Sequence, residues 1–185
     1  MSRLPFDVAC AVEVEPLRAE PREDAEQVTQ AVRGEPLRVE ERRAGWARVR
    51  TAYDYPGWIR EQALRGDPLA EARTLIGVPY EWGGLTERGI DCSGLVHVAF
   101  ARAGTWVPRD AHEQDEAGVE VEEADLRPGD LVTYVEDGAV DHVAFWAGDG
   151  RILHATARDG VSAVVEEPEP EWLRARRHRL VRLGT

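Results

Sequence analysis

The sequence contains no lysine, only two cysteines and no long apolar run. Without lysine, Schiff-base chemistry and a serine–lysine nucleophile pair are excluded. Cys10 and Cys92 are too few for a disulfide framework or a four-thiolate zinc site. No stretch approaches the roughly 18 consecutive apolar residues of a transmembrane helix, so we expect no membrane partner. Catalysis by a single cysteine thiol remains compatible with this composition.

Acidic residues outnumber basic ones by 35 to 23, which gives a formal net charge of −12 over 185 residues. This balance argues against nucleic-acid phosphates or anionic lipids as the main partner. It fits a protein that accepts a cationic group. Hydrophobic residues make up 43% of the chain, which is enough for a packed core and argues against disorder.

The first residues lack the apolar core of a signal peptide. MSRLPFDVACAVEVEP carries one arginine and is interrupted by Pro5 and Asp7. We therefore expect a cytoplasmic location. A leader removed ahead of residue 1 would instead place the protein outside the cytoplasm.

Residues 6–62 alternate short stretches rich in valine and aromatics with clusters of turn-forming residues. Five or six short strands joined by close turns predict a small antiparallel barrel. The stretches are VACAVEV, QAVRG, PLRVE, WARVR and GWIRE. We assign this all-β domain to residues 1–63.

The pattern changes after Gly66. Asp67 can cap a helix that has Pro68 at its first position, and a second helix follows from Cys92. Strands are then predicted at 131–135, 142–147, 152–156, 161–165 and 178–183, with a short helix at 169–175. Helices followed by an antiparallel sheet indicate an α+β domain, which we assign to residues 64–185.

Cys92 lies at the start of its predicted helix. Asp91 is a good N-cap, and the free N–H groups and positive dipole end of the first turn stabilise an anion. This position can lower the pKa of a thiol, and the same N–H groups can donate to an oxyanion. A buried structural cysteine explains the residue equally well at this point.

Two histidines decide between these interpretations. A catalytic thiol needs a base, and the base needs an orienting partner. DHVAFWAGDGRILHAT predicts a β-hairpin that carries His142 and His154. A regular two-residue Asp149-Gly150 turn would put them on opposite faces. We predict a three-residue loop, or a bulge of equal effect, which puts both imidazoles on one face. His97, His112 and His178 are expected to be ordinary polar residues.

Several spaced motifs resemble a known family. They are GVPYEWGG, DCSGLV from Asp91, RPGDLV, His142-Val143-Ala144 and His154-Ala155. Their order is similar to that of the NlpC-type, papain-like cysteine peptidases that cut bacterial cell-wall peptides, over residues 67–160. The resemblance implies Cys92 as nucleophile, His142 as general base and His154 as the residue that orients it. It also assigns substrate contacts to Tyr80, Asp91 and Ser93.

The N-terminal stretch resembles a bacterial SH3-like barrel. This combination is similar to a subgroup that cleaves γ-D-glutamyl–diamino acid bonds in murein peptides with a free N-terminal L-alanine. The subgroup clamps the alanine ammonium with an Arg-Asp-Ser segment and the barrel. PRDAHEQ at 108–114 supplies Asp110, but Ala111 replaces the serine. Tyr55 and Glu26 match the barrel's contributions.

These features predict a cysteine endopeptidase that needs no metal or cofactor and serves murein peptide recycling. The alternatives are a secreted hydrolase of intact wall and a non-catalytic module that binds cell-wall peptide. A lipid acyltransferase is disfavoured because Cys92 precedes both histidines. Metal binding by Cys92, His142 and His154 lacks the usual ligand spacing. The oligomeric state and the diamino acid are not determined by the sequence.

Overall fold

The computed structural model describes residues 8–64, 66–158 and 160–184. The first seven residues, where the signal-peptide argument begins, lie outside the described residues, as do positions 65, 159 and 185. In the described part, no helix is both long and apolar enough to cross a membrane.

The chain divides into two compact units. One comprises Met1–Asp67 together with Phe100–Trp106, and the other comprises Pro68–Ala99 together with Val107–Thr185. The first unit therefore includes a short segment from the middle of the sequence. Backbone hydrogen bonding explains this, because the Ala9 N–H donates to the Gly104 carbonyl at 2.8 Å. The boundary between residues 63 and 64 stays a prediction.

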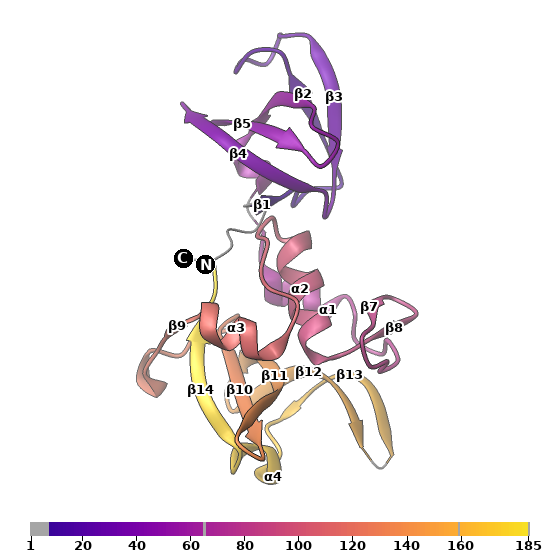
Figure 1. The fold of residues 1–185 in the computed structure, drawn as a ribbon, viewed down its shortest axis with the longest axis vertical. Helices are drawn as coiled ribbons and strands as arrows, with labels where there is room; N and C mark the ends of the chain where they lie inside the picture. Colours follow the sequence, from indigo (N-terminus) through magenta and orange to yellow (C-terminus); the bar gives the residue numbers. More distant parts are fainter. Residues whose placement is uncertain (1–7, 65, 159, 185) are drawn as a thin grey trace. The chain divides into compact units, whose positions relative to one another are not determined.

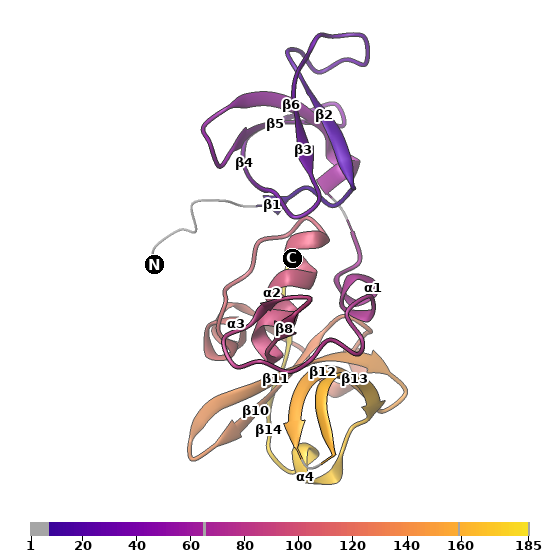
Figure 2. The same cartoon turned by 90° about the vertical axis from the view of Figure 1, so that its right-hand side faces the viewer.

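The first unit is an antiparallel sheet with strand order β1-β4-β5-β6-β2-β3 (Figure 2). Its end strands, β1 and β3, do not pair with each other in the described part of the chain. The all-β prediction is therefore confirmed, but a closed barrel is not found. The elements are β1 (Val8–Ala9), β2 (Val14–Arg18), β3 (Gln27–Val32), β4 (Pro36–Arg43), β5 (Trp46–Thr51), β6 (Pro56–Arg60) and the 3-10 helix η1 (Glu61–Leu64).

Alternating apolar residues build the core of this unit. Leu17, Leu37 and Ile59 are fully buried in one hydrophobic cluster, as period-2 patterning requires. Cys10 is fully buried in the same cluster and its thiol donates to the Val12 carbonyl at 3.3 Å. Cys10 is therefore a packing residue.

The second unit has helices packed on an antiparallel sheet with strand order β13-β12-β11-β10-β14-β9 (Figure 1). This confirms the α+β prediction. The helices are α1 (Pro68–Arg73), α2 (Cys92–Arg102), α3 (Ala111–Ala117), α4 (Glu171–Arg174) and the 3-10 helix η2 (Glu123–Asp125). The strands are β7 (Leu85–Thr86), β8 (Gly89–Ile90), β9 (Val119–Glu120), β10 (Leu131–Glu136), β11 (Ala139–Gly148), β12 (Arg151–Arg158), β13 (Val161–Pro168) and β14 (Arg177–Arg182).

Local signals set most of these boundaries. The first helix begins at Pro68, directly after Asp67, as predicted. Predicted strand 142–147 extends to Ala139–Gly148 because Asp137 and Gly138, with φ of 49° and 81°, form a tight turn that joins it to β10. Helix α3 was not predicted as an element, and it packs against β11.

Candidate active site

The start of α2 is capped as the sequence predicts. The Gly94 N–H donates to Asp91 Oδ1 at 2.7 Å, and the Leu95 N–H donates to the Asp91 carbonyl at 2.9 Å. Cys92 is thus the first residue of the helix, and it is 5% exposed. The cap fixes the direction of the cysteine side chain.

Gly94 brings another backbone segment close to this helix start. A Cβ atom at Gly94 would lie 2.3 Å from the Gly84 carbonyl oxygen and 2.8 Å from Asp91 Oδ1. The Gly83 N–H also donates to Asp91 Oδ2 at 2.7 Å. The loop before α2 therefore packs tightly on the capped turn, which explains a helical glycine that otherwise costs stability.

Arg109 joins the segment before α3 to this helix start. Its guanidinium donates to Asp91 Oδ2 at 2.7 Å and to Ser93 Oγ at 2.8 Å. Sequence reasoning used Asp110 of the same segment and missed Arg109. A signal was available, because PRDAHEQ places Arg109 at the arginine of the Arg-Asp-Ser segment that the resemblance had already indicated.

The hairpin of β11 and β12 contains the predicted bulge. Gly148 pairs with Arg151 across the Asp149-Gly150 turn, but Trp146 pairs with Ile152, so Ala147 is an extra residue. This offset puts His142 and His154 on the same face of the sheet. His142 Nε2 lies 2.8 Å from His154 Nδ1, and the two rings are edge to face. The bulge prediction is confirmed.

The hydrogen-bonded chain continues beyond the two histidines. His154 is fully buried, and its Nε2 lies 3.1 Å from Glu167 Oε1. Arg158 holds both oxygens of that carboxylate at 2.7 Å. Glu167 and Arg158 were not predicted. The signal lies in the pairing of β12 with β13, which makes Glu167 a diagonal neighbour of His154.

Burial controls the protonation of the thiol and its base. Burial raises the pKa of Cys92 to about 11, against the lowering effect of the Val143, Ser93 and Cys92 backbone N–H groups. Burial and the neighbouring His154 lower the pKa of His142 to about 3. The N–H groups of the helix start act to lower the thiol pKa, as expected, but desolvation outweighs them and the net shift is upward.

The hydrogen bond from the Val143 N–H places the Cys92 sulfur beside strand β11. The Val143 N–H that acts on Cys92 belongs to the residue after His142. Tyr80 is close as well, since burial and then the charges of Cys92 and Asp91 raise its pKa. A protonated phenol and the N–H groups of α2 are suitable donors for an oxyanion.

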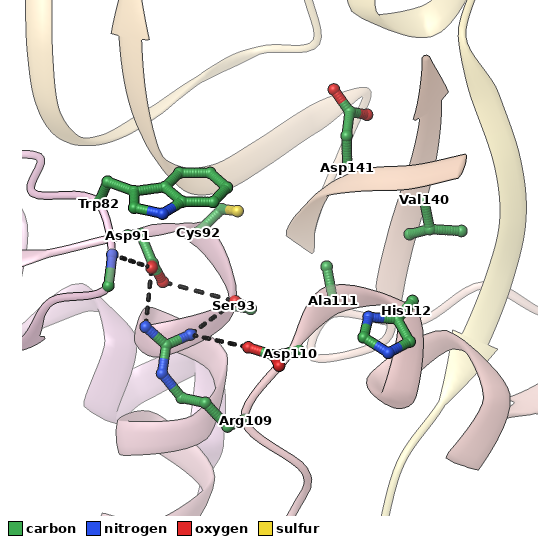
Figure 3. A pocket seen from close by; sticks show the side chains of 11 residues that line it. Trp82, Asp91, Cys92, Ser93, Arg109, Asp110, Ala111, His112, Val140 and Asp141 are labelled. Atoms are coloured by element: carbon green, nitrogen blue, oxygen red, sulfur yellow. Dashed lines mark hydrogen bonds and ion pairs between the residues drawn. The ribbon is translucent and has the colours of Figure 1, made fainter. Parts of the chain in front are cut away.

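A cavity of about 310 Å³ opens at Cys92 (Figure 3). Residues 82–83 and 91–93 form one wall, and 109–112 and 140–141 form the rest. Figure 3 shows the Cys92 sulfur and the Asp141 and Asp110 carboxylates around this space. Asp91 and Arg109 form an ion pair at 2.7 Å, whereas Asp110 is 3.8 Å from Arg109. Asp110 is thus the less neutralised carboxylate of the two.

Tyr55 and Glu26, which were predicted to contact substrate, belong to the first unit and are not among the residues that line this cavity. Tyr55 is 43% exposed and lines a surface groove with Arg18, Arg48 and Trp58. Glu26 is exposed in the turn before β3. Both belong to the other compact unit, so their contact with substrate stays a prediction.

The remaining histidines fall into two groups. His97 Nδ1 is 2.8 Å from the Val107 carbonyl, and His178 Nε2 is 3.9 Å from Asp115. Both are polar structural residues, as expected. His112 is exposed and lines the cavity, and its predicted role as an ordinary polar residue stays a prediction.

A buried thiol at a helix start, beside two hydrogen-bonded imidazoles on an antiparallel sheet, defines a papain-like cysteine-dependent hydrolase fold and site. Residues 77–178 match the model of the NlpC/P60 family, and residues 17–64 match the "Bacterial dipeptidyl-peptidase Sh3 domain" model. The chain belongs to the NlpC/P60 family.

Named relatives include two peptidases from Bacillus. The chain is 40% identical over 99 residues to the gamma-D-glutamyl-L-lysine dipeptidyl-peptidase of Bacillus subtilis and 33% identical over 110 residues to that of Bacillus cereus. These matches cover 52% and 58% of this chain but 33% of each relative. It is also 39% identical over 120 residues to the murein DD-endopeptidase/LD-carboxypeptidase MepS of Escherichia coli, covering 64% of this chain and 63% of that protein.

Solved structures agree with the fold. An NlpC/P60 family protein from Bacillus cereus matches 95% of this chain and 62% of its own, with a TM-score of 0.61 and 24% identity. The peptidoglycan hydrolase RipB of Mycobacterium tuberculosis matches 63% of each chain, with a TM-score of 0.55 and 32% identity. The first similarity supports the folds of both units, and the second supports the catalytic fold.

Proposed function

We propose that this chain is a cysteine endopeptidase that hydrolyses the γ-D-glutamyl–diamino acid bond of murein peptides. The observation that carries the proposal is the Cys92 thiol, which contacts the Val143 N–H next to the hydrogen-bonded His142–His154 pair and opens on a cavity with a weakly neutralised carboxylate, Asp110. The printed names of the two Bacillus relatives support the bond type.

The geometry supports general-base activation of a neutral thiol. The pKa of Cys92 is about 11 and that of His142 about 3, so both groups are neutral before substrate binds. As the sulfur attacks the γ-glutamyl carbonyl, the S–H proton passes to His142. The N–H groups at the start of α2 and the phenol of Tyr80 stabilise the oxyanion.

The second half of the reaction returns the proton. The imidazolium of His142 protonates the leaving amine of the diamino acid, and a glutamyl thioester remains on Cys92. A water molecule activated by the same imidazole then hydrolyses the thioester and restores the thiol. His142 and His154 are hydrogen-bonded to each other at 2.8 Å, so their lone pairs do not converge on a metal ion.

The cavity suits a substrate with a free ammonium group. Asp110, Asp91 and Asp141 line it together with a single guanidinium, that of Arg109. Arg109 is engaged by Asp91, and Asp141 is bonded to Arg176 at 2.6 Å. Asp110 is therefore the carboxylate with the most capacity for an incoming ammonium, such as that of an N-terminal L-alanine.

The direct test compares three peptides by mass spectrometry. We expect release of the diamino acid from L-Ala-γ-D-Glu-diaminopimelate, weak cleavage of its N-acetylated analogue, and no cleavage of a D-Ala–diaminopimelate cross-link. Cys92→Ala must abolish every cleavage. Exclusive cleavage of the cross-link would replace the proposal with the activity named for the Escherichia coli relative. Binding without cleavage of any peptide would favour the non-catalytic alternative.

Asp110→Asn tests the ammonium contact. We expect KM for the free peptide to rise about 10- to 100-fold, since a hydrogen bond to a charged group contributes about 1.5–3 kcal/mol. The KM of the N-acetylated peptide should not change. Glu113→Gln is the matched control, because it removes a carboxylate from the first turn of the same helix, α3, outside the cavity lining. Equal effects on both peptides would contradict the contact.

Tyr55→Phe and Glu26→Gln test the predicted contribution of the first unit by the same KM comparison.

The cytoplasmic recycling role, as opposed to hydrolysis of intact wall, also stays a proposal. Fractionation of the native host, combined with assays on purified sacculi and on soluble muropeptides, distinguishes the two.

A further inference from the structure

We propose that Glu167 is a positioning residue that determines which ring nitrogens of His154 and His142 carry protons, so that the Nδ1 lone pair of His142 faces the reaction. The tautomer assignment follows from the hydrogen-bonded chain. Its use in catalysis rests on the proposed function.

The carboxylate of Glu167 is held in its ionised form. Arg158 holds both oxygens of Glu167 at 2.7 Å in a bidentate pair, which keeps the carboxylate ionised. An ionised carboxylate only accepts hydrogen bonds. The nitrogen 3.1 Å from Glu167 Oε1, His154 Nε2, must therefore carry the proton of that ring.

The charge of His154 depends on its burial and on its neighbours Glu167 and Arg158. The ring is fully buried, while the Glu167 side chain is 21% exposed and compensated by Arg158. Burial lowers the pKa of His154, although Glu167 acts in the opposite direction. The ring is therefore neutral, and with Nε2 protonated its Nδ1 is an acceptor.

The position of the proton on His142 follows from that on His154. Its Nε2 lies 2.8 Å from His154 Nδ1, so His142 Nε2 must donate. The remaining nitrogen of a neutral His142, Nδ1, holds the free lone pair. In the proposed reaction this is the nitrogen of His142 that is able to accept the proton of the Cys92 S–H group. The resulting imidazolium keeps its hydrogen bond to His154 until it protonates the leaving amine.

Replacing the carboxylate by an amide reverses this order. Glu167 Oε1 accepts from both Arg158 and His154 Nε2, whereas Oε2 accepts from Arg158 alone. When the amide NH2 of Glu167→Gln occupies the Oε1 position, it faces His154 Nε2 and requires it to accept. His154 must then carry its proton on Nδ1 and donate to His142 Nε2. The proton of His142 moves to Nδ1, where a base is needed. A wrong tautomer of this kind strongly reduces catalysis by a serine–histidine–aspartate triad.

Imidazole nitrogen spectra of protein with 15N-labelled histidine test the assignment without substrate. Signals of His142 and His154 are identified from His142→Gln and His154→Gln. We expect both rings as Nε2–H tautomers in the unmodified protein, and a shift toward Nδ1–H in Glu167→Gln. Identical tautomers in the two proteins would overturn the proposal.

Kinetics test the consequence. We expect Glu167→Gln to lower kcat by about 10- to 100-fold, comparable to the loss of other outer partners of functional histidines, with little change in KM. Glu167→Asp, which retains an acceptor-only carboxylate, should recover part of kcat. Unchanged kcat in Glu167→Gln would refute the role.

Glu166→Gln is the matched control. Its side chain is also 21% exposed on β13, but it pairs with Arg73 and Arg151. It should change neither the tautomers nor kcat, and equal losses in both variants would indicate only a structural effect. Failure of the proposed function is recognised separately. In that case no γ-D-glutamyl peptide is cleaved by the unmodified protein, while the tautomer spectra still report on Glu167.

Discussion

At the scale of single residues, burial is the main influence on the chemistry of Cys92. The sequence places the thiol at a helix start, where backbone N–H groups favour a thiolate. The structure adds desolvation, which disfavours any charge, and this effect raises the pKa to about 11. The same cause lowers the pKa of His142 to about 3. Both shifts favour a neutral thiol and a neutral imidazole, so in the proposed reaction His142 takes the proton during the attack.

Alkylation of Cys92 by iodoacetamide should report this state. Because only the thiolate reacts, the rate in the absence of substrate should rise about tenfold per pH unit between about pH 7 and 10. The modified peptide is quantified by mass spectrometry, with the fully buried Cys10 as internal comparison. A rate that is constant from about pH 5 to 8 would show a preformed thiolate–imidazolium pair instead.

Gly94→Ala should destabilise the protein although alanine is the better helix former. The new Cβ would lie 2.3 Å from the Gly84 carbonyl oxygen, and two backbone segments must move apart. We expect a loss of about 1–3 kcal/mol in the free energy of unfolding, measured by urea denaturation, and a lower kcat/KM. A gain of about 1 kcal/mol, the difference in helix propensity, would contradict the close approach.

At the scale of elements, one extra residue in a hairpin assembles the site. Ala147 is the bulge that offsets β11 against β12. Without it, period-2 alternation would send His142 and His154 to opposite faces. The turn itself uses Asp149 and Gly150 with φ of 51° and 71°, a pattern that favours a tight hairpin. The bulge and the turn therefore act together.

Deleting Ala147 should separate the histidines while the hairpin persists. We expect kcat/KM to fall at least about 1,000-fold, because a nucleophile without its base retains only residual activity. Ala147→Gly keeps the extra residue and is the control. Activity within about tenfold of the unmodified protein after the deletion would show that the strand can re-form the bulge elsewhere.

At the scale of the whole molecule, the half-buried His142 and the fully buried His154 link the fold to pH. An exposed histidine has a pKa of about 6.5, whereas burial lowers the pKa of His142 in the fold to about 3. Between these values the unfolded chain binds a proton that the folded chain does not, so stability rises with pH. The contribution is fully present above about pH 6.5 and is lost as pH falls toward 3. The charged or titratable groups around this pair include Glu167, Arg158 and Arg176, together with Tyr134, whose ring centroid lies 5.7 Å from that of His142, and Cys92 beside Val143.

His142→Gln should reduce this acid sensitivity. Between about pH 6.5 and 5 we expect the unmodified protein to lose up to about 2 kcal/mol more than the variant, at about 1.4 kcal/mol per pKa unit. Urea denaturation at both pH values measures the difference, and the carboxylates shared by the two proteins cancel. Equal losses would contradict a depressed His142 pKa.

The sequence by itself determined what depends on neighbours along the chain. Asp91 caps the Cys92 helix through an N–H three residues away. The bulge was predicted from the requirement that His142 and His154 share one face of the hairpin. Alternation also indicated the all-β first unit and the antiparallel sheet of the second. These features are local, so their physical causes lie within a few residues.

Only the tertiary structure decided the features that join distant segments. Arg109 reaches Asp91 across 18 positions, and Glu167 reaches His154 across 13. The opposite pKa shifts of Cys92 and His142 come from desolvation, which depends on how completely other elements cover each side chain. Sequence motifs identify the reacting groups, but packing fixes their protonation and their partners.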